Sequence, residues 1–389
     1  MTSNSLSMFG KIQVNVKKLA LLLMNYLLIF FCRSGSTGGV VLIRLDNIGD
    51  FILWLDTAKA YRKLYPNQKI TLAANPSWAE LASSLPYWDE VIPINKGLFN
   101  TNLLYRWKIM RQFRKIGFET AIQPNYSREF LLGDSLVYVT GAGCRIGWEG
   151  DCANIRSSLK NISDKWYTQL ILSDDGNLKE IERNAEFIRK LSGQPFYIRL
   201  PVIPHLIQLP SCLEIEQPYC VIFPGASWNG RQWSAEQFAQ TAQILSQEQH
   251  WRIVICGGPK DLTIGSKLTS LIGEVAVNLV GLTSLLELTE IIRKSVLLIS
   301  NETSAIHIAA AVETPSVCIL GGGHFGRFLP YPDGLEYAPI AVFQAMPCFG
   351  CNWLCTQAHI EGEAVPCIQG VTVENVCNSV RQKFVNISS

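Results

Sequence analysis

The sequence predicts an α/β protein built from two parallel, doubly wound sheets. Short apolar runs, typical of buried parallel strands, alternate with segments of helical periodicity through almost the whole globular part of the chain. The alternation forms two series, separated by a segment that Pro201, Pro204, Pro210 and Pro218 punctuate. The 389 residues are also too many for one ordinary core. We therefore predict two Rossmann-like domains that face each other across a cleft.

Composition suggests where these domains begin and end. Residues 1–39 form a basic and apolar segment that closes with a Ser/Gly linker. We predict an N-terminal Rossmann-like domain over 40–205 and a linker over 206–217. The C-terminal Rossmann-like domain then covers 218–389 and includes a cysteine cluster and a terminal helix.

The elements of the first series follow from apolar periodicity. Strands are expected where the chain is continuously apolar over a few residues: 40–45, 69–73, 90–94 and 118–122. Helices are expected where apolar side chains recur at helical spacing: 51–64, 79–85, 103–116 and 178–191. Pro66 and Gly193 end the first and last of these helices. Segments 135–139 and 145–147 continue the alternation between them.

The second series repeats the pattern after the prolines. Its strands are predicted at 219–223, 252–256, 276–279, 296–299 and 316–320. Its helices are predicted at 235–248, 262–272 and 285–294, and a further Ala-rich helix follows residue 303.

Bulk composition excludes several classes of protein. Hydrophobic residues make up 48% of the chain, which excludes a disordered protein. The net charge is only +2 and no basic stripe is interleaved with aromatics, so we expect no nucleic-acid partner. Cysteines such as Cys220, Cys256 and Cys318 lie in apolar runs, as buried thiols do in a reducing compartment. These features predict a cytoplasmic protein.

The stretch Leu19–Cys32 is apolar apart from Asn25 and Tyr26, and it follows Lys17 and Lys18. It is shorter than the roughly 20 residues that a spanning helix needs, and no A-x-A cleavage site follows it. We favour an interfacial or shallow membrane anchor, with the lysines at lipid headgroups. The alternatives are a helix packed on the domain and a signal-anchor.

The polar turn before the Ala-rich helix is the strongest ligand-binding signal. It follows the predicted strand 296–299, at the carboxyl end where α/β sheets bind ligands. Hydroxyls of Thr303 and Ser304, together with the helix N-terminus, suit a diphosphate. Glu302 would repel phosphate, so we expect it to bind sugar or ribose hydroxyls. The alternative is an N-terminal capping box with a satisfied His307 in the first turn.

Similar turns follow the first strands of both halves. After 40–45, Gly49 permits a tight turn, and Asp50 is either a first-turn carboxylate that stabilises the helix or a general base. After 219–223, Ser227 and nearby N–H groups can meet a phosphate, and Arg231 offers a bidentate cation. The alternative for Arg231 is a solvated loop charge.

Two further loops carry candidates. Asp261, after Gly257 and Gly258, could accept hydrogen bonds from ribose hydroxyls or cap the helix that begins at Leu262. The Gly-rich loop 321–327 could bring backbone near a ligand or be a flexible loop. No G-x-G-x-x-G fingerprint follows the first strand, which disfavours a Rossmann oxidoreductase.

The densest cysteine cluster lies near the C-terminus. Its members are Cys348, Cys351, Cys355 and Cys367. Reduced thiolates at this spacing can hold zinc or an iron–sulfur cluster in a structural role. The alternatives are packed reduced cysteines and a disulfide pair.

Together these motifs resemble glycosyltransferase family 9, the heptosyltransferase family. The turn 44–50 resembles the N-terminal motif of the family, whose last Asp is the proposed base, and Pro224–Trp233 resembles its phosphate motif. Asp261 falls where a family acid contacts the donor nucleoside. The stretch Glu302–His307 resembles the D-T-G-x-x-H turn, with Glu302 in place of Asp and Ser304 in place of Gly.

The resemblance implies a GT-B fold and an inverting glycosyltransferase. Asp50 would be the catalytic base, and the donor would bind to Ser227, Arg231, Asp261, Glu302, Thr303, Ser304 and His307. The expected partners are a nucleotide-sugar donor, with ADP-heptose favoured, a glycan or glycolipid acceptor, and the inner-membrane surface. No cofactor is expected for catalysis. A non-catalytic nucleotide-sugar-binding protein and a sugar-nucleotide epimerase are the alternatives.

Overall fold

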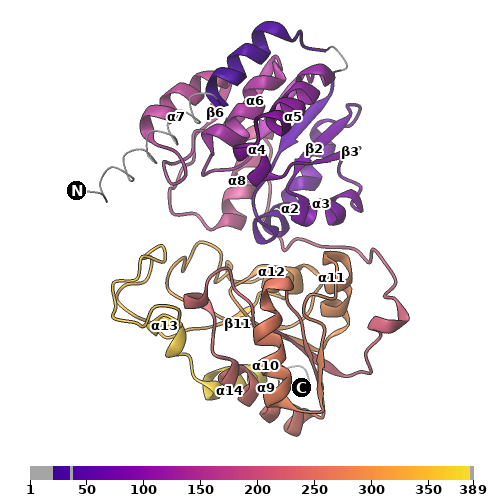
Figure 1. Cartoon of the computed structure of the whole chain (residues 1–389), viewed down its shortest axis with the longest axis vertical. Coiled ribbons are helices and arrows are strands. Elements are labelled where there is room, and N and C mark those ends of the chain that lie inside the picture. Colours follow the sequence, from indigo (N-terminus) through magenta and orange to yellow (C-terminus); the bar gives the residue numbers. More distant parts are fainter. Residues whose placement is uncertain (1–20, 36–37, 386–389) are drawn as a thin grey trace, which may run out of the picture. The chain divides into compact units, whose positions relative to one another are not determined.

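The computed structural model describes residues 21–35 and 38–385. It contains two six-stranded parallel sheets with helices packed against them, which confirms the predicted α/β, doubly wound class (Figure 1). By their contacts, the described residues fall into two compact units. The N-terminal unit contains residues up to 47, 57–176 and 183–196, and the C-terminal unit contains 48–56, 177–182 and residues from 197 onward.

The first sheet has the strand order β3-β2-β1-β4-β5-β6. Its strands are β1 (Val40–Ile43), β2 (Ile70–Ala74), β3 (Glu90–Pro93), β4 (Thr120–Gln123), β5 (Cys144–Trp148) and β6 (Gln169–Ile171). The helices of this part of the chain are α2 (Ile48–Leu64), α3 (Pro76–Ser83), α4 (Lys96–Thr101), α5 (Leu103–Ile116), α6 (Ser135–Thr140), α7 (Ser157–Ser163) and α8 (Glu180–Ser192).

One face of this sheet is covered by α5, α6 and the leading helix, the name used here for the helical residues 21–31. Leu28 of the leading helix and Phe113 of α5 share one apolar core with Val41 of β1. Buried polar contacts fix the leading helix: Arg106 donates to Asn25 at 3.1 Å, and Asn25 donates to Ser135 at 3.0 Å. The described part of the apolar stretch therefore packs on the N-terminal unit.

The second sheet has the order β12-β11-β10-β7-β8-β9. Its strands are β7 (Tyr219–Phe223), β8 (Arg252–Ile255), β9 (Ala276–Asn278), β10 (Leu297–Asn301), β11 (Ser316–Ile319) and β12 (Ile340–Val342). Its helices are α9 (Ala235–Gln249), α10 (Leu262–Ile272), α11 (Leu285–Lys294), α12 (Ser304–Ala311), α13 (Pro366–Gln369) and α14 (Val373–Val385). α9, α10 and α14 contribute to one core with the strands, while α12 packs against β10 and β11.

The structure departs from the expected elements mainly at short or polar segments. Residues 135–139, for which no element type was predicted, lie in helix α6, and the expected elements include neither β6 nor β12, each of which has only three residues. β10 runs two residues beyond the expected end, through Ser300 and Asn301. Both polar side chains are fully buried and hydrogen-bonded, which is how a strand interior tolerates them. None of the described helices is both long enough and apolar enough to cross a membrane.

Candidate functional site

The candidate site of the C-terminal unit lies where its strand order reverses. From β7 the sheet grows through β8 on one side, and through β10 and β11 on the other. The loops that follow β7 and β10 therefore leave neighbouring strands at their carboxyl ends, which is where parallel α/β sheets bind ligands. These two loops carry five of the seven predicted donor-binding residues, which are Ser227, Arg231, Glu302, Thr303 and, at the start of α12, Ser304.

Arg231 joins the two loops. Its Nη2 lies 2.9 Å from the backbone oxygen of Glu302 and 3.1 Å from the carboxylate Oε2 of the same residue. Its Nη1 donates to the Ser227 hydroxyl at 3.2 Å. The guanidinium also lies over the ring of Trp353, 4.6 Å from the centroid. Arg231 is therefore a fixed cation within the site, and the solvated-charge alternative does not describe it.

Glu302 is a buried carboxylate with unused hydrogen-bonding capacity. It is only 6% exposed, and this burial raises its pKa to about 7 although Arg231 opposes the shift. Its Oε1 and the Nε of Arg231 are buried and find no hydrogen-bond partner among the described residues. Orphaned buried polar atoms of this kind need an explanation, and a bound ligand is one.

The N-terminus of α12 directly follows the loop after β10, and no described side chain caps its first-turn amides. Thr303 is the N-cap residue, but its side chain makes no capping hydrogen bond. Its hydroxyl lies 3.1 Å from that of Ser300 instead. The first-turn N–H groups and the helix dipole are therefore suited to an anion. The capping-box alternative is not the arrangement of this turn.

His307 lies in the first turn of α12 and is buried. Its Nδ1 is 2.7 Å from the Tyr331 hydroxyl, and the two rings stack with centroids 5.9 Å apart. Burial lowers the pKa of His307 to about 4, so the ring is neutral at neutral pH. The structure thus holds His307 as a neutral residue packed on Tyr331, which no sequence spacing had linked to it.

Asp261 lies beside the loop that follows β7. Its Oδ2 accepts a hydrogen bond from the Gly258 N–H at 2.9 Å, so it caps the short turn before α10. A Cβ at Gly225 would lie only 2.5 Å from the same carboxylate, which is why the loop needs a glycine there. Burial is the main cause that raises the pKa of Asp261. Asp261 makes no side-chain capping bond to α10, so it caps the preceding short turn and not the helix that was expected, and the donor-binding role stays a prediction.

The Gly-rich loop after β11 is packed against aromatic rings. A Cβ at Gly322 would collide with Phe349, and one at Gly321 or Gly323 would collide with Trp353. These glycines allow the rings to approach the backbone, so the segment is neither an open ligand loop nor a loosely packed one. Trp353 in turn supports Arg231, which ties this packing to the site.

In the N-terminal unit the turn after β1 is held by its own ion pair. The Nε of the buried Arg44 lies 2.9 Å from Oδ2 of Asp46, and its Nη1 donates to Asn184 at 3.0 Å. Asn125, which follows β4 at the reversal point of this sheet, donates to Asp46 at 2.8 Å. Asn125 was not expected from the sequence, although its position directly after a strand was a usable signal.

Asp50 is the third residue of α2, because this helix begins at residue 48 rather than at 51 as expected. It is the acidic residue of the first turn, and the N-cap residue Asn47 makes no side-chain capping bond. A first-turn carboxylate stabilises the helix dipole, so this part of the alternative is compatible with the structure. The role of Asp50 as a base stays a prediction.

Comparisons with known proteins decide the family. A sequence model described as glycosyltransferase family 9 (heptosyltransferase) matches residues 106–355, more than half of the chain. The chain belongs to glycosyltransferase family 9. Lipooligosaccharide heptosyltransferase 2 of Haemophilus influenzae is 23% identical over 304 residues, covering 72% of this chain and 83% of that protein. Lipopolysaccharide core heptosyltransferase OpsX of the same organism is 24% identical over 295 residues, covering 75% and 81%.

Solved structures agree on the fold. The Escherichia coli ADP-heptose lps heptosyltransferase II matches with a TM-score of 0.67 at 18% identity, covering 90% of this chain and all of that one. This likeness and the two parallel sheets establish the predicted GT-B fold of two Rossmann-like domains. As a member of family 9, the protein is a glycosyltransferase, and neither the epimerase nor the non-catalytic alternative is retained.

The four clustered cysteines of this glycosyltransferase are neighbours. The pKa of the Cys367 thiol is raised first by burial and further by the nearby thiols of Cys351, Cys348 and Cys355. Cys367 also accepts a bond from the Gly322 N–H at 3.4 Å. Across 21–35 and 38–385, however, no three His, Cys, Asp or Glu side chains converge as a metal site would require. A structural metal at these thiols stays a prediction, which metal analysis of the native chain beside Cys351→Ser can test.

Proposed function

We propose that this glycosyltransferase moves heptose from ADP-heptose to a hydroxyl of a lipopolysaccharide-type glycan, or another glycan of the cell envelope, with inversion at the anomeric carbon. The names of its relatives support this choice of donor and acceptor. Conversion of an α to a β linkage, or the reverse, follows when the acceptor attacks from the face opposite the leaving group.

In the proposed reaction Asp50 accepts the proton of the attacking hydroxyl. The acceptor oxygen forms a bond to the anomeric carbon while the bond from that carbon to the diphosphate oxygen breaks. The electron pair of the broken bond leaves with ADP. One proton is thus transferred to Asp50, one glycosidic bond is made, and one bond to phosphate is lost.

The leaving diphosphate carries negative charge, and the C-terminal unit offers positive groups that can stabilise it. Arg231 supplies a positive charge held in place by Ser227 and Glu302, and α12 supplies uncapped N–H groups at its positive end. Preorganised donors of this kind stabilise developing negative charge without a reorganisation cost. In our proposal they serve where other transferases use a divalent cation.

The proposal rests on two buried polar atoms beside these donors that find no hydrogen-bond partner among the described residues. Oε1 of Glu302 can accept a hydrogen bond from a hydroxyl of the ribose or the sugar, and Nε of Arg231 can donate a hydrogen bond to a phosphate oxygen. A nucleoside diphosphate sugar meets both requirements. Asp261 and His307 complete the proposed donor site. We propose that Asp261 binds the nucleoside and that the neutral ring of His307, packed on Tyr331, forms one side of the site.

A thermal-shift screen against ADP-, GDP- and UDP-sugars tests the proposed donor. A ligand present at a hundred times its dissociation constant stabilises the folded state by about 2.7 kcal/mol, so the melting temperature rises only for the right nucleotide. We expect ADP-heptose and ADP to raise it and the GDP and UDP compounds to leave it unchanged. A rise with UDP- or GDP-sugars alone would overturn the ADP assignment and leave the family intact.

The proposed acceptor also suggests a place for the reaction. Lipid-linked glycans of the cell envelope are assembled at the cytoplasmic face of the inner membrane, so we propose that the enzyme works at that surface as a peripheral protein. The cytoplasmic location is supported by its many buried free thiols, among them Cys220, Cys256 and Cys318.

A further inference from the structure

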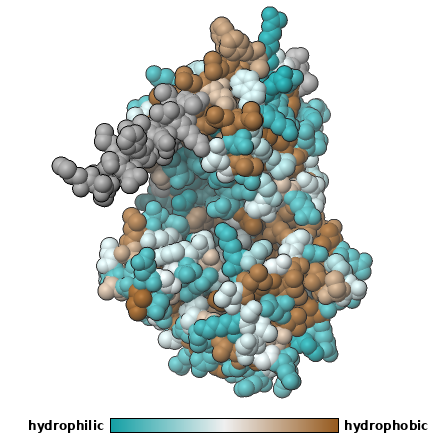
Figure 2. All heavy atoms as spheres, viewed as in Figure 1, coloured by the Kyte–Doolittle hydropathy of each residue, from teal (hydrophilic) through white to brown (hydrophobic). Residues whose placement is uncertain are grey.

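The leading helix leaves one apolar face uncovered by the described part of the protein. Large side chains on this face are exposed: Leu23 51%, Tyr26 42%, Leu27 51%, Phe30 83% and Phe31 70%. They recur at the three- and four-residue spacing that forms one helix stripe, opposite the buried Asn25 and Leu28. A contiguous patch of this kind on an otherwise well-packed unit marks an interaction surface. Figure 2 shows brown and tan side chains at this end of the unit.

The helix that supports this stripe is strongly basic. α5 packs against the leading helix through Arg106, which binds Asn25, and Arg114, whose Nε donates to the Cys32 oxygen at 2.8 Å. On the outer side of α5, Lys108, Arg111 and Lys115 are exposed at three- and four-residue spacing. None of these three forms an ion pair within the residues that the structure describes.

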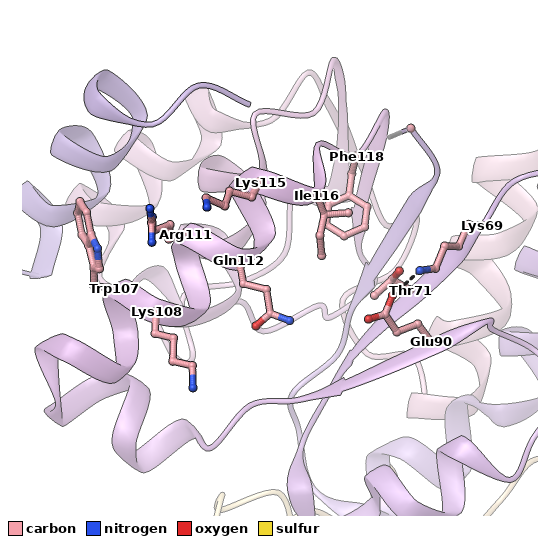
Figure 3. Close-up of a pocket in the computed structure, with 11 residues that line it drawn as sticks. Lys69, Thr71, Glu90, Trp107, Lys108, Arg111, Gln112, Lys115, Ile116 and Phe118 are labelled. Carbon is pink, nitrogen blue, oxygen red and sulfur yellow. Dashed lines mark ion pairs between the residues drawn. The ribbon is translucent and has the colours of Figure 1, made fainter. Parts of the chain in front are cut away.

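Beyond α5 the cations line a cavity of about 930 Å³ between this helix and the β2–β3 edge of the sheet (Figure 3). Lys108 and Gln112 extend from α5 toward the open space, and Ile116 and Phe118 form its apolar end. The acid on its wall, Glu90, is paired with Lys69 at 2.6 Å. The cavity therefore offers excess positive charge next to apolar surface.

The charge of this region contrasts with that of the whole chain. The net charge is only +2, yet no Asp or Glu occurs before Asp46, and none occurs over 91–118, which contains six Lys and Arg residues. A surface that is basic and free of acids, adjoining an exposed apolar stripe, is complementary to anionic headgroups above an apolar layer.

We propose that the stripe of the leading helix and the basic face of α5 dock the enzyme on a bilayer that contains anionic lipid. The stripe inserts among the acyl chains near the surface, while Lys108, Arg111 and Lys115 bind lipid phosphates at and beside the cavity. This deepens the proposed function by naming the partner surface of an enzyme with a lipid-linked acceptor. The docking itself does not depend on which sugar is transferred.

A second copy of the chain is a poorer occupant than a bilayer. A two-fold dimer through this face would bring the basic side of one α5 near that of the other, because symmetry pairs the same patch with itself. Like charges at such short range would oppose association. A membrane meets the apolar and the basic parts at once.

Vesicle flotation of the full chain tests the proposal. We expect the native protein to float with phosphatidylcholine vesicles that contain phosphatidylglycerol, and to bind less as salt rises or when the anionic lipid is omitted. Phe30→Ser with Phe31→Ser should reduce binding, and so should Lys108→Glu with Arg111→Glu, the charge pair by roughly twentyfold or more. Light scattering on the same samples reports whether the chain dimerises.

Matched variants separate this surface from general effects. Leu354→Ser with Ile360→Ser alters two equally exposed apolar residues of the C-terminal unit, and Lys267→Glu with Lys294→Glu makes the same change in net charge. Both should float like the native protein. Equal losses in test and control variants, absence of native binding, or dimerisation lost in the Phe variants would each overturn the proposal. ADP thermal shifts on all variants report donor binding separately, so failure of the proposed function is distinguishable.

Discussion

The two sheets reverse their strand order in the same way, yet the turns at the two reversal points are held differently. In the N-terminal unit the ion pair Arg44–Asp46 lies within a single turn. In the C-terminal unit the ion pair Arg231–Glu302 spans 71 residues and joins the loops that follow two different strands. The first pair is local, although Asn125 and Asn184 tie it to other elements, whereas the second pair itself joins two loops that are distant in the sequence.

This difference indicates how one topology supports two roles. The local pair belongs to the turn that precedes Asp50, the proposed base. The Arg231–Glu302 pair holds a cation beside the N-terminus of α12. It also leaves two buried polar atoms without partners among the described residues, as a donor site would. Substitutions in the two turns should therefore fail in different ways, and each prediction below uses that contrast.

The largest effect is expected at Asp50. Asp50→Asn removes the proton acceptor while retaining size and much of the polarity, so kcat should fall by roughly 10²–10⁴-fold, the usual contribution of a general base. The thermal shift with ADP should change little, because the substitution leaves Ser227, Arg231 and the N-terminus of α12 in place. Nucleotide release from ADP-heptose, followed with an acceptor glycan, measures the first effect. Full activity in the variant would remove Asp50 as the base.

The next effect is expected at Arg231. Arg231→Gln removes the cation and leaves Glu302 buried without its partner, so the dissociation constant for ADP should rise about ten- to a hundredfold. Arg231→Lys retains the charge and should recover part of the affinity, although the fork that contacts two loops is lost. Arg252→Gln, which alters an exposed arginine paired with Glu216, is the matched control. Equal ADP affinity in Arg231→Gln and the control would show that Arg231 does not bind the diphosphate.

The pH dependence of stability should reveal two opposing groups in the C-terminal unit. Burial raises the pKa of Glu302 from 4.5 to about 7, so the folded state holds a proton that the unfolded chain releases, and the free energy of unfolding falls as pH rises through this interval. Burial lowers the pKa of His307 from 6.5 to about 4, so the free energy of unfolding rises with pH there. Each group contributes up to about 3 kcal/mol, and between pH 4.5 and 6.5 they oppose each other.

Single substitutions should reveal how each of the two groups changes stability with pH. In Glu302→Gln the melting temperature should rise from pH 4.5 to 6.5, because Glu302 no longer opposes the contribution of His307 in that interval. In His307→Gln it should fall across the same window. Scanning calorimetry of the two variants beside the native chain provides the measurement. Parallel curves in all three proteins would contradict the burial of these groups.

Much of the fold could be predicted because periodicity reports burial. The helices at 103–116, 262–272 and 285–294 and the strand at 219–223 have the bounds that the apolar pattern indicated. The pattern failed where the buried side chains are polar. Ser300 and Asn301 continue β10 because the Ser300 hydroxyl donates to the neighbouring Asn301 oxygen and the Asn301 amide donates to the distant Pro224 oxygen. Three-residue edge strands such as β12 are too short to show any period.

The candidate site could be predicted as a set of turns, but not as a network. Ser227, Arg231, Glu302 and Thr303 were found because polar residues follow apolar strands at the carboxyl edge of a sheet. Their pairing could not be found, since no local signal joins Arg231 to Glu302. The same holds for contacts that arise only from packing, which bring Tyr331 to His307 and Trp353 to Arg231.

The smallest effect is expected at Asp261. Its size distinguishes a residue that only caps the turn from one that also binds the donor. In Asp261→Asn an amide oxygen can still accept the Gly258 N–H, so the free energy of unfolding should change by less than about 1 kcal/mol. If the other carboxylate oxygen binds ribose hydroxyls, the loss of charge should weaken ADP binding about three- to tenfold, since charge-assisted bonds are the stronger ones. Calorimetric titration with ADP and with inorganic diphosphate distinguishes the two roles, because diphosphate lacks the ribose and should bind both proteins alike. An unchanged ADP affinity would leave Asp261 as a cap and confine the donor contacts to the loops after β7 and β10.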